Sequence, residues 1–498
     1  MATVTKNIEA NTTGECLYRL FLPNIFNNTD PRIEGTPTKT IQSAPTTSLS
    51  AVARIYYVST SGSDSNPGTL ACPWRTIQKA ANSMSAGDTV EIRAGTYNER
   101  VLISRSGNAT EGYIVYKNYT GETPIIDGTG IEITPSAGLI NMLNVSYIKI
   151  VGLKVTNSDD AGIYVRRAQY IVVQDNITQN TVSSGVGIWN SDNILVDSNT
   201  VVDARNVDIS QGGHEESISI SSTKNFEVRN NDVSLRTNSG FLGNEGIDIK
   251  DSSQNGKVHH NYVHNFPVEG GAIYVDAWSA GLNGTPSLSN IEIYCNVVEN
   301  AGPIVIGSER GGTAENIKIY NNLVINGPES GIEISNTGIS NTPYGDGLRK
   351  KIEIFSNTVY KVRWSGGAGI LVESANISNI VIRNNITYMN NYNGEIVVAV
   401  PSALVQVSAD HNLVYGPKHC SQAFPNCVEV SNITNSTIFG NITADPKFTD
   451  LSSPDLHLAT GSPGIDSGVS LAASGVVTDF DGVDRPQGGV YDMGAYER

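Results

Sequence analysis

Two short segments, GIDIK and AIYVD, alternate aliphatic with ionisable or phenolic side chains. This alternation indicates strands, so Asp248 and Lys250 share one side of the first strand, and Tyr274 and Asp276 share one side of the second. An amine with a lowered pKa can abstract a proton from carbon, a phenol can donate one, and carboxylates can bind Ca²⁺. If the two strands are parallel neighbours, Lys250 lies beside Asp276, with Asp248 on the diagonal. These four residues form the candidate site.

Further polar and aromatic residues flank the two segments. Glu245 could join the two aspartates as a Ca²⁺ ligand, and Arg310 could neutralise a carboxylate on a substrate. Region 216–310 gathers ionisable groups that region 316–440 largely lacks. The residues that could bind a sugar chain by stacking or by hydrogen bonds are Tyr164, Trp189, His214, Glu216, Trp278 and Glu309.

A repeated pair of short runs must position these residues. The first run alternates apolar residues and recurs about every 30 residues, a spacing typical of a solenoid. Its first isoleucine stands at Ile163, Ile188, Ile218, Ile247, Ile273, Ile304, Ile332 and Ile370. The second run ends in asparagine, at Asn176, Asn199, Asn231, Asn261, Asn296, Asn322, Asn357 and Asn385, with weaker copies ending at Asn412 and Asn441.

The repeat predicts an all-β fold, a single right-handed parallel β-helix in which each coil contributes two or three short strands around an Ile/Val interior. The recurring asparagines are expected to form a buried ladder, because stacked amides can satisfy backbone groups at a bend. We expect an extended arm or linker over 1–53 and an N-terminal strand–helix–strand cap over 54–100. The β-helix is expected over 101–445 and a loop-rich C-terminal cap over 446–498.

Stacking the first runs in register predicts two columns of side chains that point away from the interior. One column reads Tyr164, Trp189, Ser219, Asp248, Tyr274, Val305, Glu333 and Leu371. The other reads Arg166, Ser191, Ser221, Lys250, Asp276, Gly307, Ser335 and Glu373.

Charge and composition exclude several classes of partner. The chain has 498 residues and a net charge of −16, which argues against binding to nucleic acid or to anionic membranes. No apolar run is long enough for a membrane span, and the short stretch 17–22 has neither the basic region nor the cleavage site of a signal peptide. The five cysteines do not indicate a disulfide framework, although Cys420 and Cys427 are close enough to pair.

Both ends of the repeat carry familiar segments, YYVSTSGSDSNPGT with PWRTIQKAANSMSAGDTVEIRAGTY at the start and SPGIDSG with DFDGVDRPQGGVYDMGAYE at the end. Over about residues 54–498 the chain resembles secreted β-helix proteins of the pectate-lyase-like superfamily, which includes lyases, glycoside hydrolases, epimerases and non-catalytic surface proteins. The layout around NEGIDIKDSSQNGKVHHNYVHN is similar to that of one Ca²⁺-dependent pectate-lyase family. That family has paired aspartates where this chain has Glu269-Gly270-Gly271, and a catalytic lysine near 304–306, where this chain has none. The family's catalytic residues are therefore not transferred.

The resemblance and the site residues together predict an extracellular or cell-surface monomer that acts on a polysaccharide. The first hypothesis is a lyase that cleaves a uronate-containing glycan by β-elimination. Lys250 would be the base, Tyr274 the proton donor, Arg310 the neutralising cation, and Asp276 a further catalytic group. Ca²⁺ would be held by Glu245, Asp248 and Asp276.

Other interpretations stay open at this point. A glycoside hydrolase would use two carboxylates, for example Asp248 or Asp276 with Glu309. A non-catalytic surface or glycan-binding scaffold is the third possibility. A lysine between two aspartates on a sheet is also a common structural ion pair. The aspartates of the tail, Asp479, Asp481 and Asp484, could bind Ca²⁺ or could form a polar turn.

Overall fold

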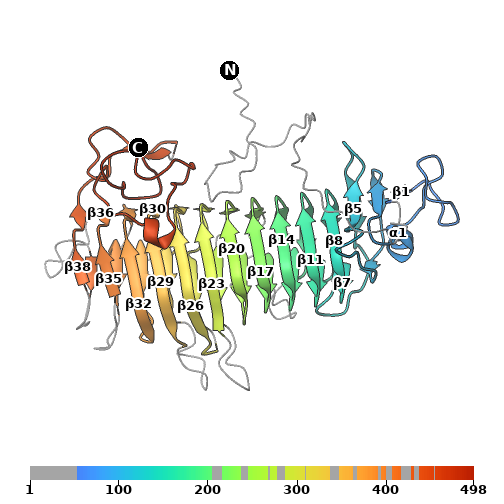
Figure 1. Ribbon diagram of the computed structural model, residues 1–498, viewed down its shortest axis with the longest axis horizontal. Helices are drawn as coiled ribbons and strands as arrows, with labels where there is room; N and C mark the ends of the chain where they lie inside the picture. The colour runs from blue at the N-terminus through green and yellow to red at the C-terminus, as the bar shows by residue number, and fades with distance from the viewer. Residues whose placement is uncertain are drawn as a thin grey trace, which may run out of the picture.

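The computed structural model describes residues 53–204, 216–236, 245–266, 270–277, 287–308, 310–336, 347–362, 367–390, 394–399, 407–416, 428–430, 437–453 and 455–498. The predicted arm over 1–53 therefore lies almost entirely outside the described residues. Three long parallel sheets wind around one axis, and their strands follow one another as successive rungs along the length of the molecule (Figure 1). This is the predicted right-handed parallel β-helix.

Sheet C has 12 strands and contains the first runs of the repeat. Its strands are β4 (Val101–Ile103), β7 (Gly138–Leu143), β10 (Ala161–Arg166), β13 (Val186–Trp189), β16 (Ile218–Ser221), β19 (Ile247–Lys250), β22 (Ile273–Asp276), β25 (Ile304–Gly307), β28 (Ile332–Ile334), β31 (Ile370–Val372), β34 (Ile396–Val398) and β37 (Val428–Val430).

Sheet A has 14 strands and contains the second runs. Its strands are β1 (Ile55–Val58), β2 (Thr89–Ile92), β5 (Ile114–Asn118), β8 (Ser146–Val151), β11 (Gln169–Gln174), β14 (Asp192–Asp197), β17 (Lys224–Arg229), β20 (Gln254–His259), β23 (Ser287–Tyr294), β26 (Thr313–Tyr320), β29 (Arg349–Phe355), β32 (Ile377–Arg383), β35 (Val407–Asp410) and β38 (Thr437–Phe439).

Sheet B has 13 strands, each of which begins just after a ladder asparagine or its equivalent. Its strands are β3 (Gly95–Tyr97), β6 (Pro124–Asp127), β9 (Lys154–Thr156), β12 (Ile177–Thr181), β15 (Thr200–Ala204), β18 (Asp232–Ser234), β21 (Tyr262–His264), β24 (Val297–Glu299), β27 (Leu323–Ile325), β30 (Thr358–Tyr360), β33 (Ile386–Tyr388), β36 (Leu413–Tyr415) and β39 (Ile442–Thr443).

Each complete coil passes through sheet C, then sheet A, then sheet B, and alternate residues point into a shared interior. Ile247 and Ile249 of β19, and Ile273 and Val275 of β22, are all 0% exposed. A single continuous cluster of mostly Ile and Val side chains fills the solenoid from end to end. Burial of these apolar side chains fixes the register, because a slip by one residue would turn every aliphatic side chain outward.

A ladder of ten buried or half-buried asparagines stands at the bend between sheets A and B. Each Nδ2 donates to the Oδ1 of the next asparagine at 2.9–3.1 Å, and the members are the ten asparagines that the repeat predicts. Asn296 is typical. Its Nδ2 also donates to the carbonyl oxygen of Val258 at 2.9 Å, and its Oδ1 accepts from the backbone N–H of Asn261 at 3.0 Å. The ladder prediction is confirmed.

The N-terminal end begins with the predicted strand–helix–strand unit. The helix, α1 (Ile77–Ser83), is shorter than the predicted 74–84 and starts after Thr76, whose hydroxyl accepts from the N–H of Lys79. Its buried residues are Ile77, Ala80 and Ala81. The two strands of this unit, β1 and β2, pair with each other and begin sheet A. Within the described ranges no helix is long and apolar enough to cross a membrane.

The C-terminal tail contains the antiparallel pair β40 (Phe448–Asp450) and β41 (Asp455–Leu458) and then folds back over the last rungs, beside β30 and β36 (Figure 1). It docks on the side of the solenoid through hydrogen bonds. Asn321 Nδ2 donates to the Thr478 carbonyl oxygen at 2.8 Å, and the N–H of Ala495 donates to Thr358 Oγ1 at 3.0 Å.

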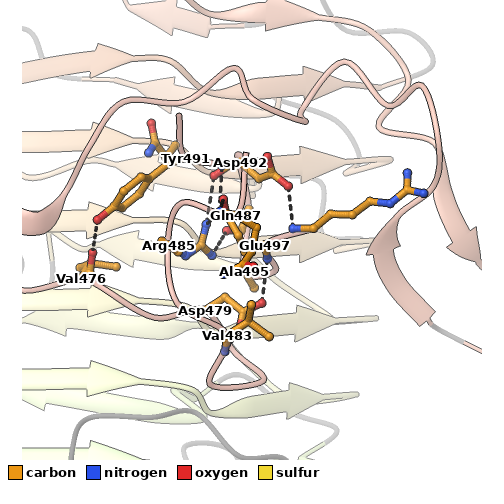
Figure 2. A network of polar contacts seen from close by, with 12 residues as sticks. Val476, Asp479, Val483, Arg485, Gln487, Tyr491, Asp492, Ala495 and Glu497 are labelled. Carbon is orange, nitrogen blue, oxygen red and sulfur yellow. Dashed lines mark hydrogen bonds and ion pairs between the residues drawn. The ribbon is translucent and has the colours of Figure 1, made fainter. Parts of the chain in front are cut away.

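A buried ion pair organises this tail. Arg485 Nη1 lies 3.0 Å from Glu497 Oε2, and both side chains are fully buried (Figure 2). Asp479 accepts from the backbone N–H groups of Val483 and Glu497, each at 2.7 Å. These contacts make Asp479 the centre of a polar turn. Among the described residues no group of three acidic, His or Cys side chains is arranged to hold a metal ion.

The ladder leads to a stability prediction. Asn296→Ala should lower the free energy of unfolding by at least about 2 kcal/mol, because it leaves the buried Asn261 N–H and Val258 carbonyl without partners. Urea denaturation measures the change. Asn316→Gly is the control, since Asn316 is exposed on sheet A with a positive φ that glycine adopts freely, and it should change stability by less than about 0.5 kcal/mol. Equal losses in both variants would contradict the role of the ladder.

Candidate functional site

The four residues of the candidate site lie together on the outward side of sheet C. Adjacent rungs pair Asp248 with Tyr274 and Lys250 with Asp276, as predicted. Their aliphatic neighbours enter the core, so all four side chains point away from it. They are nevertheless well covered, because Asp248 and Asp276 are each 2% exposed and Tyr274 is 7% exposed. The site is therefore a set of shielded polar groups rather than an open charged surface.

Lys250 is held by two carboxylates. Its Nζ lies 2.6 Å from Glu216 Oε2 and 3.5 Å from Asp248 Oδ2. Glu216 comes just before β16, one rung below, and was predicted only as a residue that binds the sugar chain. The geometry instead makes it the main ion-pair partner of Lys250. A short ion pair with little exposure favours the ammonium form of the lysine.

The surroundings of Asp248 disfavour the charged form of its carboxyl group. Burial is the largest cause that raises its pKa well above the ordinary value, and repulsion by Glu216, Asp276 and Glu245 adds to it, while Lys250 opposes it. Its Oδ1 is buried and has no hydrogen-bond partner within the described part of the chain, and neither has the hydroxyl of Ser219. Ser219 is the register neighbour of Asp248. Two unsatisfied polar atoms therefore face each other across adjacent rungs.

The fit of Ca²⁺ to this cluster can be judged from the donor set. Glu216, Asp248, Asp276 and Glu245 supply only oxygen donors and repel one another, which suits a hard cation. However, no three carboxylates in the described ranges converge with the geometry of a metal site. The ammonium group of Lys250 lies where it neutralises Glu216 and Asp248. The residues fit a cation in charge and chemistry, with Lys250 as the present counter-ion.

The predicted register is wrong for one aromatic residue. Trp189 lies beside Arg166 on one side and Ser221 on the other, so it belongs to the column of Lys250 and not to that of Asp248. The position beside Tyr164 is taken by Gly187. A Cβ at Gly187 would lie 3.1 Å from Tyr164 Cδ2, so only a residue without a side chain leaves room for the tyrosine ring.

The corrected register keeps the aromatic pair together. The rings of Tyr164 and Trp189 are tilted, with centroids 5.9 Å apart. Trp189 is two rungs from Lys250 in the same column. The pair therefore flanks the polar cluster on its N-terminal side, a distance of about 10 Å along the axis.

The remaining predicted residues are placed as follows. Glu245 immediately precedes β19 and contributes to the field at Asp248. Arg310 is exposed and follows β25. His214, Trp278 and Glu309 lie outside the described residues, and so do Cys420 and Cys427.

The predicted columns contain an acidic pair farther along sheet C, Glu333 and Glu373, which was not included in the candidate site. Glu333 lies in the column of Asp248 and Tyr274, two rungs beyond Tyr274. Burial, and repulsion by Glu373, raise the pKa of Glu333 to about 7. Glu333 and Glu373 are therefore the ionisable side chains of the predicted columns that lie beyond residue 316. The alternation in GIEIS was the available signal, because it already placed Glu333 outward.

This acidic pair leads to a pH prediction. The raised pKa of Glu333 means that the folded state binds a proton more tightly than the unfolded state. The resulting stability is full below the unfolded pKa and is lost as the pH rises through about 7. Glu333→Gln should reduce the fall in stability between pH 5 and pH 8, by up to about 1.4 kcal/mol per pH unit. Thermal denaturation across this range measures it. Glu315→Gln, on sheet A, should keep the wild-type slope, and an unchanged slope in Glu333→Gln would contradict the assignment.

Comparisons with known proteins agree with the fold. A family described as "Pel9A-like, right handed beta helix region" matches residues 56–214. YwoF of Bacillus subtilis, described as uncharacterized, is 27% identical over 442 residues, which cover 82% of this chain and 91% of that protein. Pectate lyase PEL9 of Emericella nidulans is 31% identical over 141 residues, which cover 26% of this chain and 34% of that protein.

Among solved structures, that of pectate lyase Pel9A covers 91% of this chain and 98% of its own, with a TM-score of 0.48 and 14% sequence identity. The strand pairing, the asparagine ladder and the matching family region agree with one another. The chain is a right-handed parallel β-helix, and over residues 56–214 it is similar to the Pel9A-like β-helix family.

Proposed function

We propose that this protein is a carbohydrate-active enzyme that acts outside the cell, a lyase that cleaves a uronate-containing polysaccharide on the outward side of sheet C. One observation carries the proposal. Lys250 is held between Glu216 and Asp248, with Asp276 beside it in the register. A lysine among several carboxylates on a face lined by aromatic residues supplies both the charge and the proton acceptor that β-elimination needs.

The cluster divides the roles among its residues. Lys250 would pass its own proton to Glu216, whose Oε2 lies 2.6 Å from Nζ, and the resulting neutral amine would take the proton from carbon. Ca²⁺ binding by Asp248, Asp276 and Glu245 remains a prediction from the sequence, since no three acidic side chains in the described ranges converge as a metal site requires. Tyr274 lies beside Asp248 and is the proposed donor to the leaving oxygen. Asp276 orients Lys250 as its neighbour on the next rung.

The aromatic pair and the exposed arginine would bind the chain on either side of this centre. Trp189, which is half-buried, lies toward the N-terminal end and offers apolar area for a sugar ring, whereas Tyr164 is 4% exposed and packs beside the Trp189 ring. Arg310 lies one rung beyond Asp276 and would contact a carboxylate of the substrate. The roles of His214, Trp278 and Glu309 in binding remain predictions from the sequence.

The comparisons support a carbohydrate-active enzyme, but they do not decide between a lyase and a hydrolase. One relative bears the name pectate lyase, and its match covers 26% of this chain. The region that matches the Pel9A-like family, residues 56–214, ends before Glu216 and Lys250. The assignment of a lyase therefore depends on the cluster itself.

If the protein is a lyase that uses Lys250 as the base, replacing Lys250 should greatly slow the formation of an unsaturated product. Lys250→Ala should lower the rate at which ultraviolet-absorbing product forms from polygalacturonate by at least about 100-fold, because proton abstraction contributes on this scale. The assay follows absorbance in the presence of added Ca²⁺ and, separately, of a chelator. Lys257→Ala is the matched control, since Lys257 is exposed on sheet A, and it should retain wild-type activity. Full activity of Lys250→Ala would contradict the role of Lys250 as the base.

A glycoside hydrolase is the second candidate, and the state of Asp248 favours it. A carboxyl group whose pKa is raised by burial can act as a general acid, and Asp276 on the next rung could serve as its partner. If this candidate is right, the wild type should release reducing ends without any ultraviolet signal. Asp248→Asn and Asp276→Asn should each abolish that release. Glu315→Gln should leave that release unchanged. Formation of a conjugated double bond by the wild-type protein would exclude the hydrolase.

A further inference from the structure

A second groove runs along the molecule outside sheet B, away from the cluster on sheet C. It encloses about 740 Å³ and crosses rungs β15, β18, β21, β24 and β27, so it spans about 19 Å parallel to the axis. Its lining includes Leu235, Arg236, Asn265, Asn300, Asn326 and Pro328. This edge of sheet B, where each strand ends, is here named the sheet B furrow.

A row of amides follows the sheet B furrow. Asn265, Asn300 and Asn326 stand one rung apart, each with a left-handed backbone, with φ of 59°, 50° and 56°. Their backbone N–H groups bond to the next rung, which leaves the side chains outside the ladder of the sheet. Asn300 and Asn326 make no side-chain hydrogen bond to any part of the chain that the structure describes.

A matched row on sheet A behaves differently. Asn255, Asn290 and Asn316 have the same backbone, with φ of 57°, 59° and 58°. There, Asn290 Nδ2 donates to Asn255 at 3.0 Å, and Asn316 Nδ2 donates to Asn290 at 2.7 Å. The sheet A row thus uses its amides internally, whereas the row in the furrow keeps donors and acceptors available at a spacing of about 4.8 Å.

The other walls of the sheet B furrow add one positive charge and some apolar surface. Arg236 is exposed, and its backbone N–H donates to Asp203 Oδ1 at 2.7 Å, which anchors the residue. Its guanidinium makes no ion pair with any residue that the structure describes. His264 has both ring nitrogens engaged, with Asp232 at 2.9 Å and Asn265 at 2.9 Å. Leu235 and Pro328 supply apolar contact for the C–H faces of a sugar ring.

The same edge of sheet B is hollowed again nearer the N-terminus. A space of about 420 Å³ lies among residues that include Gly128, Asn157 and Asn180. Asn180 Nδ2 donates to Asn157 Oδ1 at 3.4 Å, which is a weak bond. Both hollows follow the axis of the solenoid on the exit edge of one sheet, which is the shape that an extended polymer needs.

We propose that the sheet B furrow is a second binding site for an extended polysaccharide, which is held through its hydroxyl groups by Asn265, Asn300 and Asn326 and through one carboxylate by Arg236. Repeating amides one rung apart suit a ligand that itself repeats along its length. The exposed guanidinium of Arg236 suits a glycan that bears uronate groups in a protein of net charge −16. The site would keep the enzyme on an insoluble or long substrate. This inference uses the substrate class proposed above, and its test needs no catalysis.

The test measures retention in native gels that contain polygalacturonate, with Lys250→Ala as the parent so that cleavage does not disturb the gel. The triple variant Asn265→Gly, Asn300→Gly, Asn326→Gly should weaken retention at least about fivefold, and Arg236→Ala should weaken it in polygalacturonate but not in a neutral xylan. Glycine keeps the left-handed backbone of these positions. The matched control is Asn255→Gly, Asn290→Gly, Asn316→Gly, which should behave like the parent.

Retention equal to that of the parent in the furrow variants would overturn the proposal, and so would equal losses in the furrow and control variants. The result is independent of the proposed reaction. If the wild type forms no unsaturated product but the furrow variants lose retention, the second site stands and the lyase assignment fails. If the wild type forms the product and the furrow variants keep full retention, the lyase stands and the second site fails.

Discussion

The structure depends on one constraint, that buried polar groups at each bend of the solenoid must find partners. The ladder asparagines meet it by donating both to a backbone carbonyl and to the amide one rung away, as Asn296 does. Because each amide bonds to the next, every coil is held in line with its neighbours. The same alignment stacks the outward residues of sheet C, so Lys250 and Asp276 become neighbours although 26 positions separate them, from 250 to 276. The site is a consequence of the ladder.

Much of the fold could be predicted because its determinants recur. The Ile/Val alternation gave sheet C and sheet A, and all ten ladder asparagines stand where the repeat placed them. Sheet B could not be separated from the bend, since strands such as β18 and β21 are three residues long and carry polar side chains. The predicted register was wrong at Trp189. In VGIW either Val186 or Ile188 could be aligned with Ile163 of the preceding rung, and the space needed by the Tyr164 ring decides between the two alignments.

The candidate site was predicted only in part. Alternation was sufficient to bring Asp248, Lys250, Tyr274 and Asp276 to one face. It could not show that Glu216 is the partner of Lys250, because that contact joins a loop residue to a strand one rung away, 34 positions along the chain. The burial of individual carboxyl groups also could not be predicted from the sequence. It raises the pKa of Asp248 and of Glu333, and the alternation of residue types carries no information on how deeply a carboxyl group is buried. The open amides of the sheet B furrow likewise have the same sequence signature as the bonded amides of sheet A.

The account centres on the outward side of sheet C as the place where a glycan meets Lys250. A crystal structure of the Lys250→Ala protein soaked with a uronate tetrasaccharide tests this most directly. A sugar chain is expected along the axis over β16, β19 and β22, with one carboxylate group close to Arg310. A tetrasaccharide bound only on sheet A, or on sheet B with sheet C bare, would contradict it.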